Sequence, residues 1–183
     1  QMGASAGVHI IDDAVHGSDA LATSAILAEA IKKVGPDLVI CGMASTDGTM
    51  GVVPVMIAER LSWPAATLGA TLSVADDQVT IRRDDDVASL TIEVSLPAIV
   101  SVTDQSGEAR YPSMRGILAA KKKPVESWTL ADLDIEPSSV GLNAAWSKVL
   151  QTSARPGKEP GRVVEDEDGV PALIDFLAAG KYI

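Results

Sequence analysis

DLVICGMASTDGTMGVVPVMIAERL occupies residues 37–61 and joins an apolar run to a helical pattern through a glycine-rich loop. After Asp37 the run shows no alternation of polar and apolar residues, so we predict a strand that is buried on both faces. Beyond the loop, Ile57, Ala58 and Leu61 recur at helical spacing. A strand, a loop and a helix in this order are typical of a βαβ unit, so the stretch predicts an α/β fold.

The segment before this stretch repeats the same order of elements. SAGVHIID at 5–12 predicts a short buried strand. A helix is predicted to follow, capped by Ser18 or Asp19 and ended by Gly35 and Pro36. Strands that alternate with helices favour a parallel sheet with both faces covered.

The hydrophobic period changes to two from about residue 65. ATLSVADDQVTIRR at 70–83 and VASLTIEVSLP at 87–97 are predicted to form antiparallel strands, the first pair joined at Asp76 and Asp77. PAIVSV at 97–102 is again apolar throughout and predicts a buried strand.

We expect two domains, a nucleotide-binding α/β domain at 1–152 and an extended arm with a short C-terminal helix at 153–183. The arm, 153–168, is rich in proline, glycine and charge, and 169–183 is amphipathic. A doubly wound sheet ordinarily has another βα unit ahead of the strand at 5–12, so we expect the N-terminal part of the sheet to be missing. An unpaired sheet edge would leave the chain marginally stable or prone to aggregate.

The composition excludes several classes of function. The chain has 183 residues, is 46% hydrophobic and carries a net charge of −10, which favours a packed core and argues against nucleic-acid binding. No apolar stretch approaches the roughly 20 residues that span a bilayer, so we expect no membrane insertion. The single cysteine, Cys41, lies inside an apolar run and is interpreted as a small buried residue in a reducing, cytoplasmic compartment.

The loop from Gly42 to Gly51 is a candidate nucleotide site, because open α/β sheets bind nucleotides at the carboxyl ends of their strands. Its glycines allow the backbone to approach a ligand, and the amides at the helix start can face a phosphate. Asp47 can accept a hydrogen bond from a ribose hydroxyl or an adenine amine. The loop matches neither GxGxxG nor a Walker motif, so phosphate transfer from ATP is not predicted. The alternative is a glycine-rich turn with Asp47 as a local cap.

Residues that could support catalysis are few. His9 falls inside a predicted buried strand, and a core or capping role is favoured for both His9 and His16. Cys41 in mid-strand lacks the access that a nucleophile needs. The acidic triplet Asp84–Asp86 is interpreted as a solvated charge cluster rather than a metal site. We therefore predict no enzyme activity for this chain.

RYPSMRGILAAKKKP at 110–124 contains five of the fifteen positive charges of an acidic chain. This local concentration favours a docking patch for a partner. The alternative is that Met114 is a core residue and that the lysines form a solvated helix end ahead of Pro124.

Three segments resemble the beta subunit of electron transfer flavoprotein, in its bacterial, AMP-binding type. They are DLVICGMASTDGTMGVVPVMIAERLSWP at 37–64, IRRDDDVASLTIEVSLPAIVSVTDQSGEARYPSMRGILAAKKKP at 81–124, and DFLAAGKYI at 175–183. The resemblance runs in order over nearly the whole chain, except that the family's first strand has no counterpart. It implies an α/β, doubly wound, mostly parallel sheet of the adenine-nucleotide alpha-hydrolase-like (Rossmann-like) type, with an antiparallel extension and a C-terminal arm.

The resemblance also implies a heterodimer, in which an alpha subunit holds most of an FAD and the beta subunit binds AMP as a structural ligand. The 153–183 segment would pack on that alpha subunit. Some relatives bind a second FAD in place of AMP, but the loop is more similar to the AMP type. Asp84 matches a carboxylate that contacts the flavin domain of the alpha subunit. The residues implied to bind AMP are Gly42, Ser45, Asp47, Gly48, Thr49, Gly51, Val52 and Val53.

In the family, the 110–124 block grips acyl-CoA dehydrogenases. The resemblance implies that Met114 enters an apolar pocket and that the helix after it carries the lysines. Electrons from fatty acid beta-oxidation would pass through the alpha subunit's FAD to a membrane quinone reductase. The residues implied to dock are Arg110, Tyr111, Pro112, Ser113, Met114, Ile117, Lys121, Lys122 and Lys123.

Two other functions stay open from the residues alone. A stand-alone adenine-nucleotide sensor of the universal-stress type shares the sheet and the glycine-rich loop, but such a sensor does not require the 110–124 block or the arm. An enzyme of the nucleotide alpha-hydrolase group is the third possibility.

Overall fold

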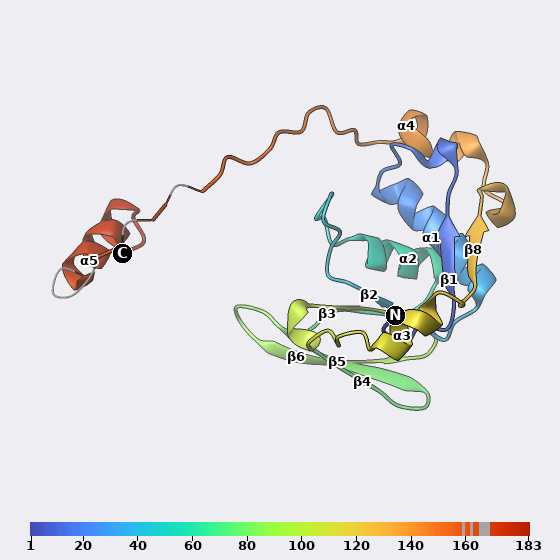
Figure 1. Cartoon of the computed structure of the whole chain (residues 1–183), viewed down its shortest axis with the longest axis horizontal. Helices are drawn as coiled ribbons and strands as arrows, with labels where there is room; N and C mark the ends of the chain where they lie inside the picture. Colours follow the sequence, from blue (N-terminus) through green and yellow to red (C-terminus); the bar gives the residue numbers. More distant parts are fainter. Residues whose placement is uncertain (159, 162, 165–168) are drawn as a thin grey trace. The chain divides into compact units, whose positions relative to one another are not determined.

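The computed structural model describes residues 1–158, 160–161, 163–164 and 169–183. The chain divides into two compact units, residues 1–148 and residues 149–183 (Figure 1). The predicted arm at 153–168 includes residues 159, 162 and 165–168, which lie outside the described residues.

The first unit is a mixed α/β structure with five parallel strands in two sheets. In the smaller sheet β1 (Gly7–Ile10) pairs with β8 (Val125–Trp128). In the larger sheet the order is β2-β7-β3, with β2 at Leu38–Cys41, β7 at Ala98–Val102 and β3 at Ala65–Gly69. The parallel pairing confirms the α/β prediction. The single continuous sheet that we expected is instead divided, because no described strand lies between β1 and β2.

Two helices cover one face of these strands (Figure 1). The first, α1 (Ala20–Val34), packs Ala22, Ile26 and Ala30 against the buried Trp128 at the end of β8. The second, α2 (Val53–Leu61), packs Ile57 and Ala58 against Ile99 of β7, and Leu27 and Ile31 of α1 join the same cluster. The second helix therefore buries the apolar stripe that the sequence predicted, with Ile57 and Ala58 buried and Leu61 partly buried.

An antiparallel sheet covers the other face of the larger parallel sheet. It consists of β4 (Thr71–Val74), β5 (Gln78–Asp84) and β6 (Ser89–Ser95) in sequence order. Val79 and Ile81 of β5 are fully buried against Ala66 of β3 and Val100 of β7. The two strands predicted on either side of Asp76 and Asp77 are confirmed. The predicted helix layer on this face is replaced by this sheet within the described residues.

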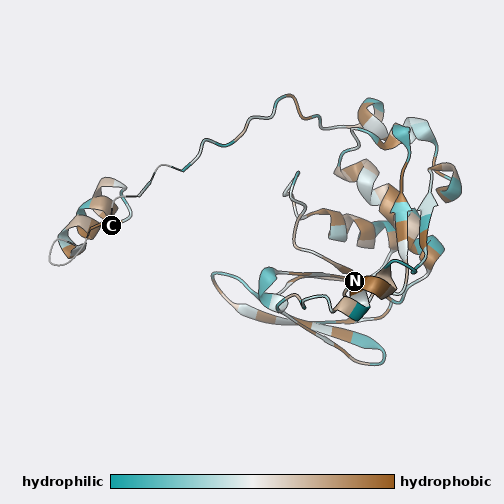
Figure 2. Cartoon of the chain, viewed as in Figure 1, coloured by the Kyte–Doolittle hydropathy of each residue, from teal (hydrophilic) through white to brown (hydrophobic). Residues whose placement is uncertain are grey.

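Short helices complete the described chain. The second unit contains α5 (Gly169–Ala179), which exposes Val170, Leu173, Ile174 and Phe176, each by more than half of its surface. Figure 2 shows brown, hydrophobic residues along this helix. The remaining elements are η1 (Asp13–Val15), η2 (Asp104–Ser106), α3 (Met114–Ala120), η3 (Ala131–Leu133), η4 (Pro137–Ser139), α4 (Gly141–Ala144) and α5 (Gly169–Ala179).

The strands β1 and β2 are less buried than the sequence predicted. Val8 of β1 is 43% exposed and Ile40 of β2 is 55% exposed, and His9 is also exposed. Each strand has a described neighbour on one side only, so its other edge and the side chains beside it remain in contact with water. Cys41 is half-buried, and this burial raises the pKa of its thiol, which disfavours a nucleophilic role.

Asp19 caps α1 and ties it to a distant part of the first unit. Its Oδ1 accepts a hydrogen bond from the Ala22 amide at 3.1 Å, and its Oδ2 accepts from the amides of Trp146 at 2.8 Å and Ser147 at 3.4 Å. Of the two predicted caps, Asp19 is therefore the one that caps the helix. These hydrogen bonds hold the pKa of the Asp19 carboxyl below its ordinary value of 3.8, and the bond from the Ala22 amide has the largest effect.

Replacing Asp19 with alanine should destabilise the chain and change its acid sensitivity. Loss of an N-cap side chain costs about 1 kcal/mol. Because the pKa of Asp19 is lower in the folded chain, its charged form contributes above pH 3.8, and this contribution is lost as the pH falls through the folded-state pKa. Urea unfolding of Asp19→Ala and the parent chain at pH 7 and pH 3 should show a difference that shrinks in acid. Asp76→Ala, an exposed carboxylate in the β4–β5 turn, is the control, and an equal loss in both variants would contradict the assignment.

Candidate functional site

The loop of residues 42–52 connects the carboxyl end of β2 to the start of α2. Because β2 and β7 are parallel, the loop lies at the edge of the larger sheet where the carboxyl ends of its strands gather. Residues 42–50 and Val52 are exposed, and Gly51 and Val53 are partly buried. All eight residues predicted to bind AMP lie within this loop or at its junction with α2, so the structure leaves them accessible from one side.

Asp47 organises the tip of the loop. Its Oδ1 accepts a 2.6 Å hydrogen bond from the Gly48 amide. The Ser45 hydroxyl, and then the Gly48 amide, hold the pKa of the Asp47 carboxyl below its ordinary value. The Thr49 amide donates to the Ser45 carbonyl at 3.1 Å, and Thr49 has a φ of 50°. Asp47 thus acts as a local cap, which is one of the two roles that the sequence predicted. Its exposed carboxylate still has free acceptor positions for a ligand.

The start of α2 carries backbone amides that lack a side-chain cap. Val52 is the N-cap residue and its side chain accepts no hydrogen bond, while Pro54 in the first turn has no N–H to donate. Gly51 has a φ of 67°, and a Cβ at this position would stand 3.3 Å from the Met43 carbonyl oxygen. The loop therefore turns tightly into the helix and presents the amides of Gly51, Val52 and Val53, where the helix dipole favours an anion.

The neighbouring strand end has a feature that we did not predict. Leu68 of β3 has a φ of 63°, and its amide donates to the Oγ of buried Ser101 at 2.9 Å. The pairing of β3 with β7 shifts register between Ala66 and Gly69. Ser101, a polar residue inside the apolar run AIVSV, is the sequence signal that could have indicated this irregular strand end.

Asp84 lies in a different layer from the loop, at the end of β5 in the antiparallel sheet. Arg82 donates to its Oδ2 at 3.2 Å, so the carboxylate is already paired within this chain. Asp85 holds the turn that follows, because its Oδ1 accepts from the amides of Val87 and Ala88. The contact of Asp84 with a flavin domain stays a prediction.

The 110–124 block forms an exposed surface around α3. Ser113 caps the helix by accepting from the Gly116 amide at 3.0 Å, which places Met114 at the first helical position. Tyr111 is 99% exposed, Met114 76% and Leu118 60%, whereas Ile117 is partly buried. Met114 is therefore not a core residue, and that part of the alternative was wrong. Leu118 was missed, although it follows Met114 by four residues and so lies on the same helical face.

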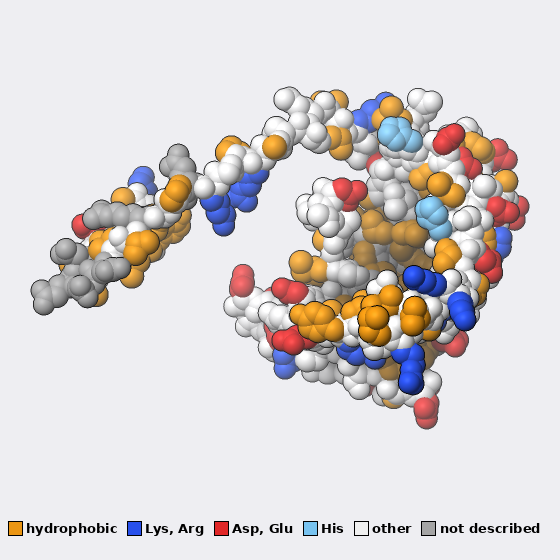
Figure 3. All heavy atoms as spheres, in the orientation of Figure 1, with side chains coloured by type: hydrophobic (Ala, Val, Ile, Leu, Met, Phe, Trp, Pro, Cys, Tyr) orange, Lys and Arg blue, Asp and Glu red, His pale blue; other side chains and the backbone are white. Residues whose placement is uncertain are grey.

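The cations of this block differ in their contacts. α3 ends at Ala120, so Lys121, Lys122 and Lys123 follow the helix instead of lying on it, which corrects the prediction. Arg110 donates to the Met2 carbonyl at 2.6 Å and Lys123 donates to the Ala4 carbonyl. The exposed cations beside the apolar residues are Arg115, Lys121 and Lys122. Figure 3 shows blue side chains flanking a row of orange ones in this region.

Neither a membrane-spanning helix nor a metal cluster is found in the part of the chain that the structure describes. No helix there is both long enough and apolar enough to cross a bilayer. No three side chains of His, Cys, Asp or Glu gather there in a way that could hold a metal ion.

The fold and the loop define a mixed α/β protein with a glycine-rich connection at the carboxyl edge of a parallel sheet. The model of the electron transfer flavoprotein domain matches residues 1–133. The chain is 45% identical to the electron transfer flavoprotein subunit beta of Mycobacterium leprae and 42% identical to that of Mycobacterium tuberculosis H37Rv, and each match covers the whole chain and 69% of the relative. The chain belongs to the electron transfer flavoprotein family and resembles its beta subunits throughout.

A further relative carries a different name. The caffeyl-CoA reductase-Etf complex subunit CarD of Acetobacterium woodii is 34% identical over 89% of this chain and 63% of its own length. The members of this family are electron carriers rather than enzymes, so the prediction of an electron-transfer subunit without its own catalytic group is confirmed. Family membership also disfavours the universal-stress sensor and the alpha-hydrolase alternatives.

Two glycines of the loop should respond differently to alanine. Gly51 has a left-handed backbone and a crowded Cβ position, whereas a Cβ on Gly42 would meet nothing within 4 Å. A left-handed conformation costs a residue with a Cβ about 1–2 kcal/mol. Gly51→Ala should therefore lower the free energy of unfolding by about that amount, and Gly42→Ala should leave it nearly unchanged. Urea titration of the two variants measures the difference, and equal stability would mean that the turn at Gly51 is not required.

Proposed function

We propose that the chain is the beta subunit of a heterodimeric electron carrier of the bacterial cytoplasm. The carrier accepts electrons from acyl-CoA and related dehydrogenases through an FAD held mainly by the alpha subunit, and it passes them to a membrane quinone reductase. The observation that carries this proposal is the exposed apolar and basic surface around α3, which is suited to a partner with an apolar pocket and an acidic rim. The fold would be of the adenine-nucleotide alpha-hydrolase-like type.

The loop of residues 42–52 fits AMP as a structural ligand. Its uncapped amides at Gly51, Val52 and Val53 suit a phosphate, and the exposed Asp47 carboxylate suits a ribose hydroxyl or the adenine amine. No lysine lies in the loop, so the charge of a triphosphate would have no counterion there. This favours a ligand with a single phosphate. A second FAD is the competing occupant.

The proposed docking role rests on the exposed apolar side chains of the 110–124 block. Met114 and Leu118 stand on one exposed side of α3, and Tyr111 precedes the helix cap. A methionine adapts to pockets of different shape, which a carrier with several partners requires. One relative is named as part of a complex with a caffeyl-CoA reductase, which supports a partner that handles a CoA thioester. We propose Asp84 as a contact of the alpha subunit's flavin domain, released from Arg82 when that domain approaches.

Asp47→Ala should release AMP from the heterodimer. The change removes the acceptor for the nucleotide and also frees Ser45 and the Gly48 amide, so the loop loses its local order. Nucleotide extracted from purified heterodimer and quantified by chromatography should fall well below one equivalent, whereas flavin content and reduction should persist. Asp76→Ala, in the β4–β5 turn, should retain the full equivalent. Wild-type AMP content in Asp47→Ala would refute the assignment, and FAD in the extract would identify the competing ligand.

Met114→Ala and lysine removal should impair electron transfer in different ways. Truncating an anchor side chain that is buried in the partner's pocket costs about 2 kcal/mol. This is equivalent to roughly a 30-fold loss of affinity and does not depend on salt concentration. Lys121→Ala and Lys122→Ala should instead slow association at low salt and have little effect near 1 M, where the Debye length is about 3 Å. Electron transfer from an acyl-CoA dehydrogenase, titrated against the heterodimer at both salt levels, separates the two effects.

Matched variants control this experiment. Val87→Ala removes a comparable apolar side chain that is 95% exposed in the β5–β6 turn, and Lys148→Ala removes an exposed lysine outside the block. Neither should alter the titration. If Met114→Ala behaves like Val87→Ala, the α3 surface is not the docking site. Lys123→Ala is kept separate, because Lys123 also holds the Ala4 carbonyl.

A further inference from the structure

Met114 differs from the other methionines of the chain in its access to water. It is 76% exposed, and Met50 follows at 63%. Met2 and Met43 are about half exposed, and Met56 of α2 is partly buried. A peroxide must reach the sulfur of a methionine in order to oxidise it. Met114 therefore holds the most accessible thioether of the chain.

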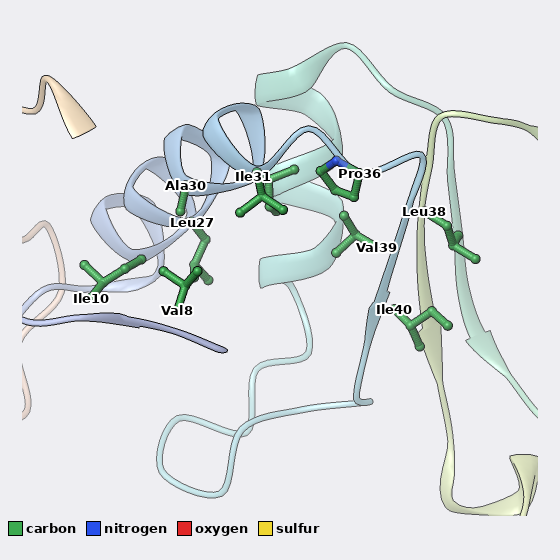
Figure 4. Close-up of a pocket in the computed structure, with 10 residues that line it drawn as sticks. Val8, Ile10, Leu27, Ala30, Ile31, Pro36, Leu38, Val39 and Ile40 are labelled. Atoms are coloured by element: carbon green, nitrogen blue, oxygen red, sulfur yellow. The ribbon is translucent and has the colours of Figure 1, made fainter. Parts of the chain in front are cut away.

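The other apolar and sulfur-containing side chains compete poorly for a peroxide. The cavity lined by β1, α1 and β2 contains only aliphatic side chains and a proline, without sulfur (Figure 4). The single cysteine, Cys41, is half-buried, and this burial raises the pKa of its thiol. Because peroxides attack the thiolate, the raised pKa slows the reaction at Cys41. The exposed methionines are therefore the sulfur atoms that react first.

The surroundings of Met114 connect its oxidation to binding. Tyr111 is exposed just before the helix cap, and Leu118 is exposed one helical turn after Met114. The bond from the Gly116 amide to the Ser113 hydroxyl fixes Met114 at the first helical position. A sulfoxide has a strongly polar oxygen, and burying that oxygen in an apolar pocket without a donor is unfavourable.

We propose that Met114 is a reversible oxidation site, an inference that rests on the proposed docking function. A peroxide converts its thioether to a sulfoxide and so lowers the affinity of the 110–124 block for its partner.

The reaction needs only hydrogen peroxide as oxidant. The sulfur donates an electron pair to one peroxide oxygen, so an S–O bond forms and the O–O bond breaks. The sulfur thereby loses two electrons, and the second oxygen takes up the remaining proton and leaves as water. A dithiol reductant reverses the change: its two thiols form a disulfide, and the sulfoxide oxygen leaves as water.

Treatment of the full 183-residue chain with hydrogen peroxide tests the site itself. Peptide mass spectrometry follows the gain of one oxygen at each methionine with time. Met114 should be oxidised first and Met56 last. Faster oxidation of Met43 or Met50 would show that the assignment to Met114 is wrong. This measurement does not depend on docking.

The effect on binding is measured with the heterodimer. The heterodimer is oxidised, freed of peroxide and titrated against an acyl-CoA dehydrogenase. Coupling should weaken about tenfold, as expected for a polar group buried without a partner. Methionine sulfoxide reductases of both stereochemical classes, supplied with a dithiol, should restore it. A loss that these enzymes do not reverse would contradict a reversible site.

A matched pair of variants makes the test specific, and each variant is compared with its own untreated sample. Met114→Leu keeps an apolar side chain without sulfur, so peroxide should not change its coupling. Met50→Leu removes the next most exposed sulfur, and its coupling should fall on oxidation as in the parent. If Met114→Leu loses as much coupling as the parent, the effect arises at another residue and the proposal is overturned.

Untreated Met114→Ala separates this inference from the docking function. If Met114→Ala couples like the parent, the docking function itself fails. If Met114→Ala is impaired while the oxidised parent is not, the docking function stands and the oxidation proposal is wrong.

Discussion

Strand β7 must be covered on both faces, and the rest of the first unit is arranged to do so. Ala98, Ile99 and Val100 are fully buried, and Ser101 nearly so. Ile99 packs under α2, while its neighbour Val100 packs on the antiparallel sheet. The strand therefore holds two unlike layers together. Its carboxyl end also lies beside the candidate nucleotide loop and leads, through η2, into the 110–124 block.

This position gives the two proposed sites a common support. The loop of residues 42–52 depends on β2, which is held by its ladder to β7. The 110–124 block follows β7 and η2, and the chain then returns to the smaller sheet through β8. A substitution that loosens β7 should therefore disturb both sites together. Surface changes in either site leave this common support in place.

The sequence predicted the elements whose signal is local. The apolar run and helical spacing of residues 37–61 gave β2 and α2, and the period of two after residue 65 gave the antiparallel strands. The division of the parallel strands was not predicted, because a strand pattern does not specify which strand lies beside it. For the same reason Val8 and Ile40 were expected to be buried, although each stands at a free edge.

The contacts of the 110–124 block with distant residues could not be predicted from the sequence either. The contacts of Arg110 with Met2 and of Lys123 with Ala4 join residues more than a hundred positions apart. No local pattern indicates them. In the nucleotide loop, by contrast, the role of Asp47 as a cap of its own turn was available from the sequence, because Asp commonly bonds to nearby amides.

The same two contacts have a consequence for recognition. Arg110 and Lys123 stand at opposite ends of the block, and both fasten it to the lead-in of β1, while the Gln1 carbonyl lies so near Gly116 that a Cβ there would stand 2.6 Å from it. A segment fastened at both ends has little conformational entropy left to lose when a partner arrives. The residues ahead of β1 thus hold the 110–124 block in place. In the proposed docking role their order would contribute to affinity for the partner, although they are not part of the surface.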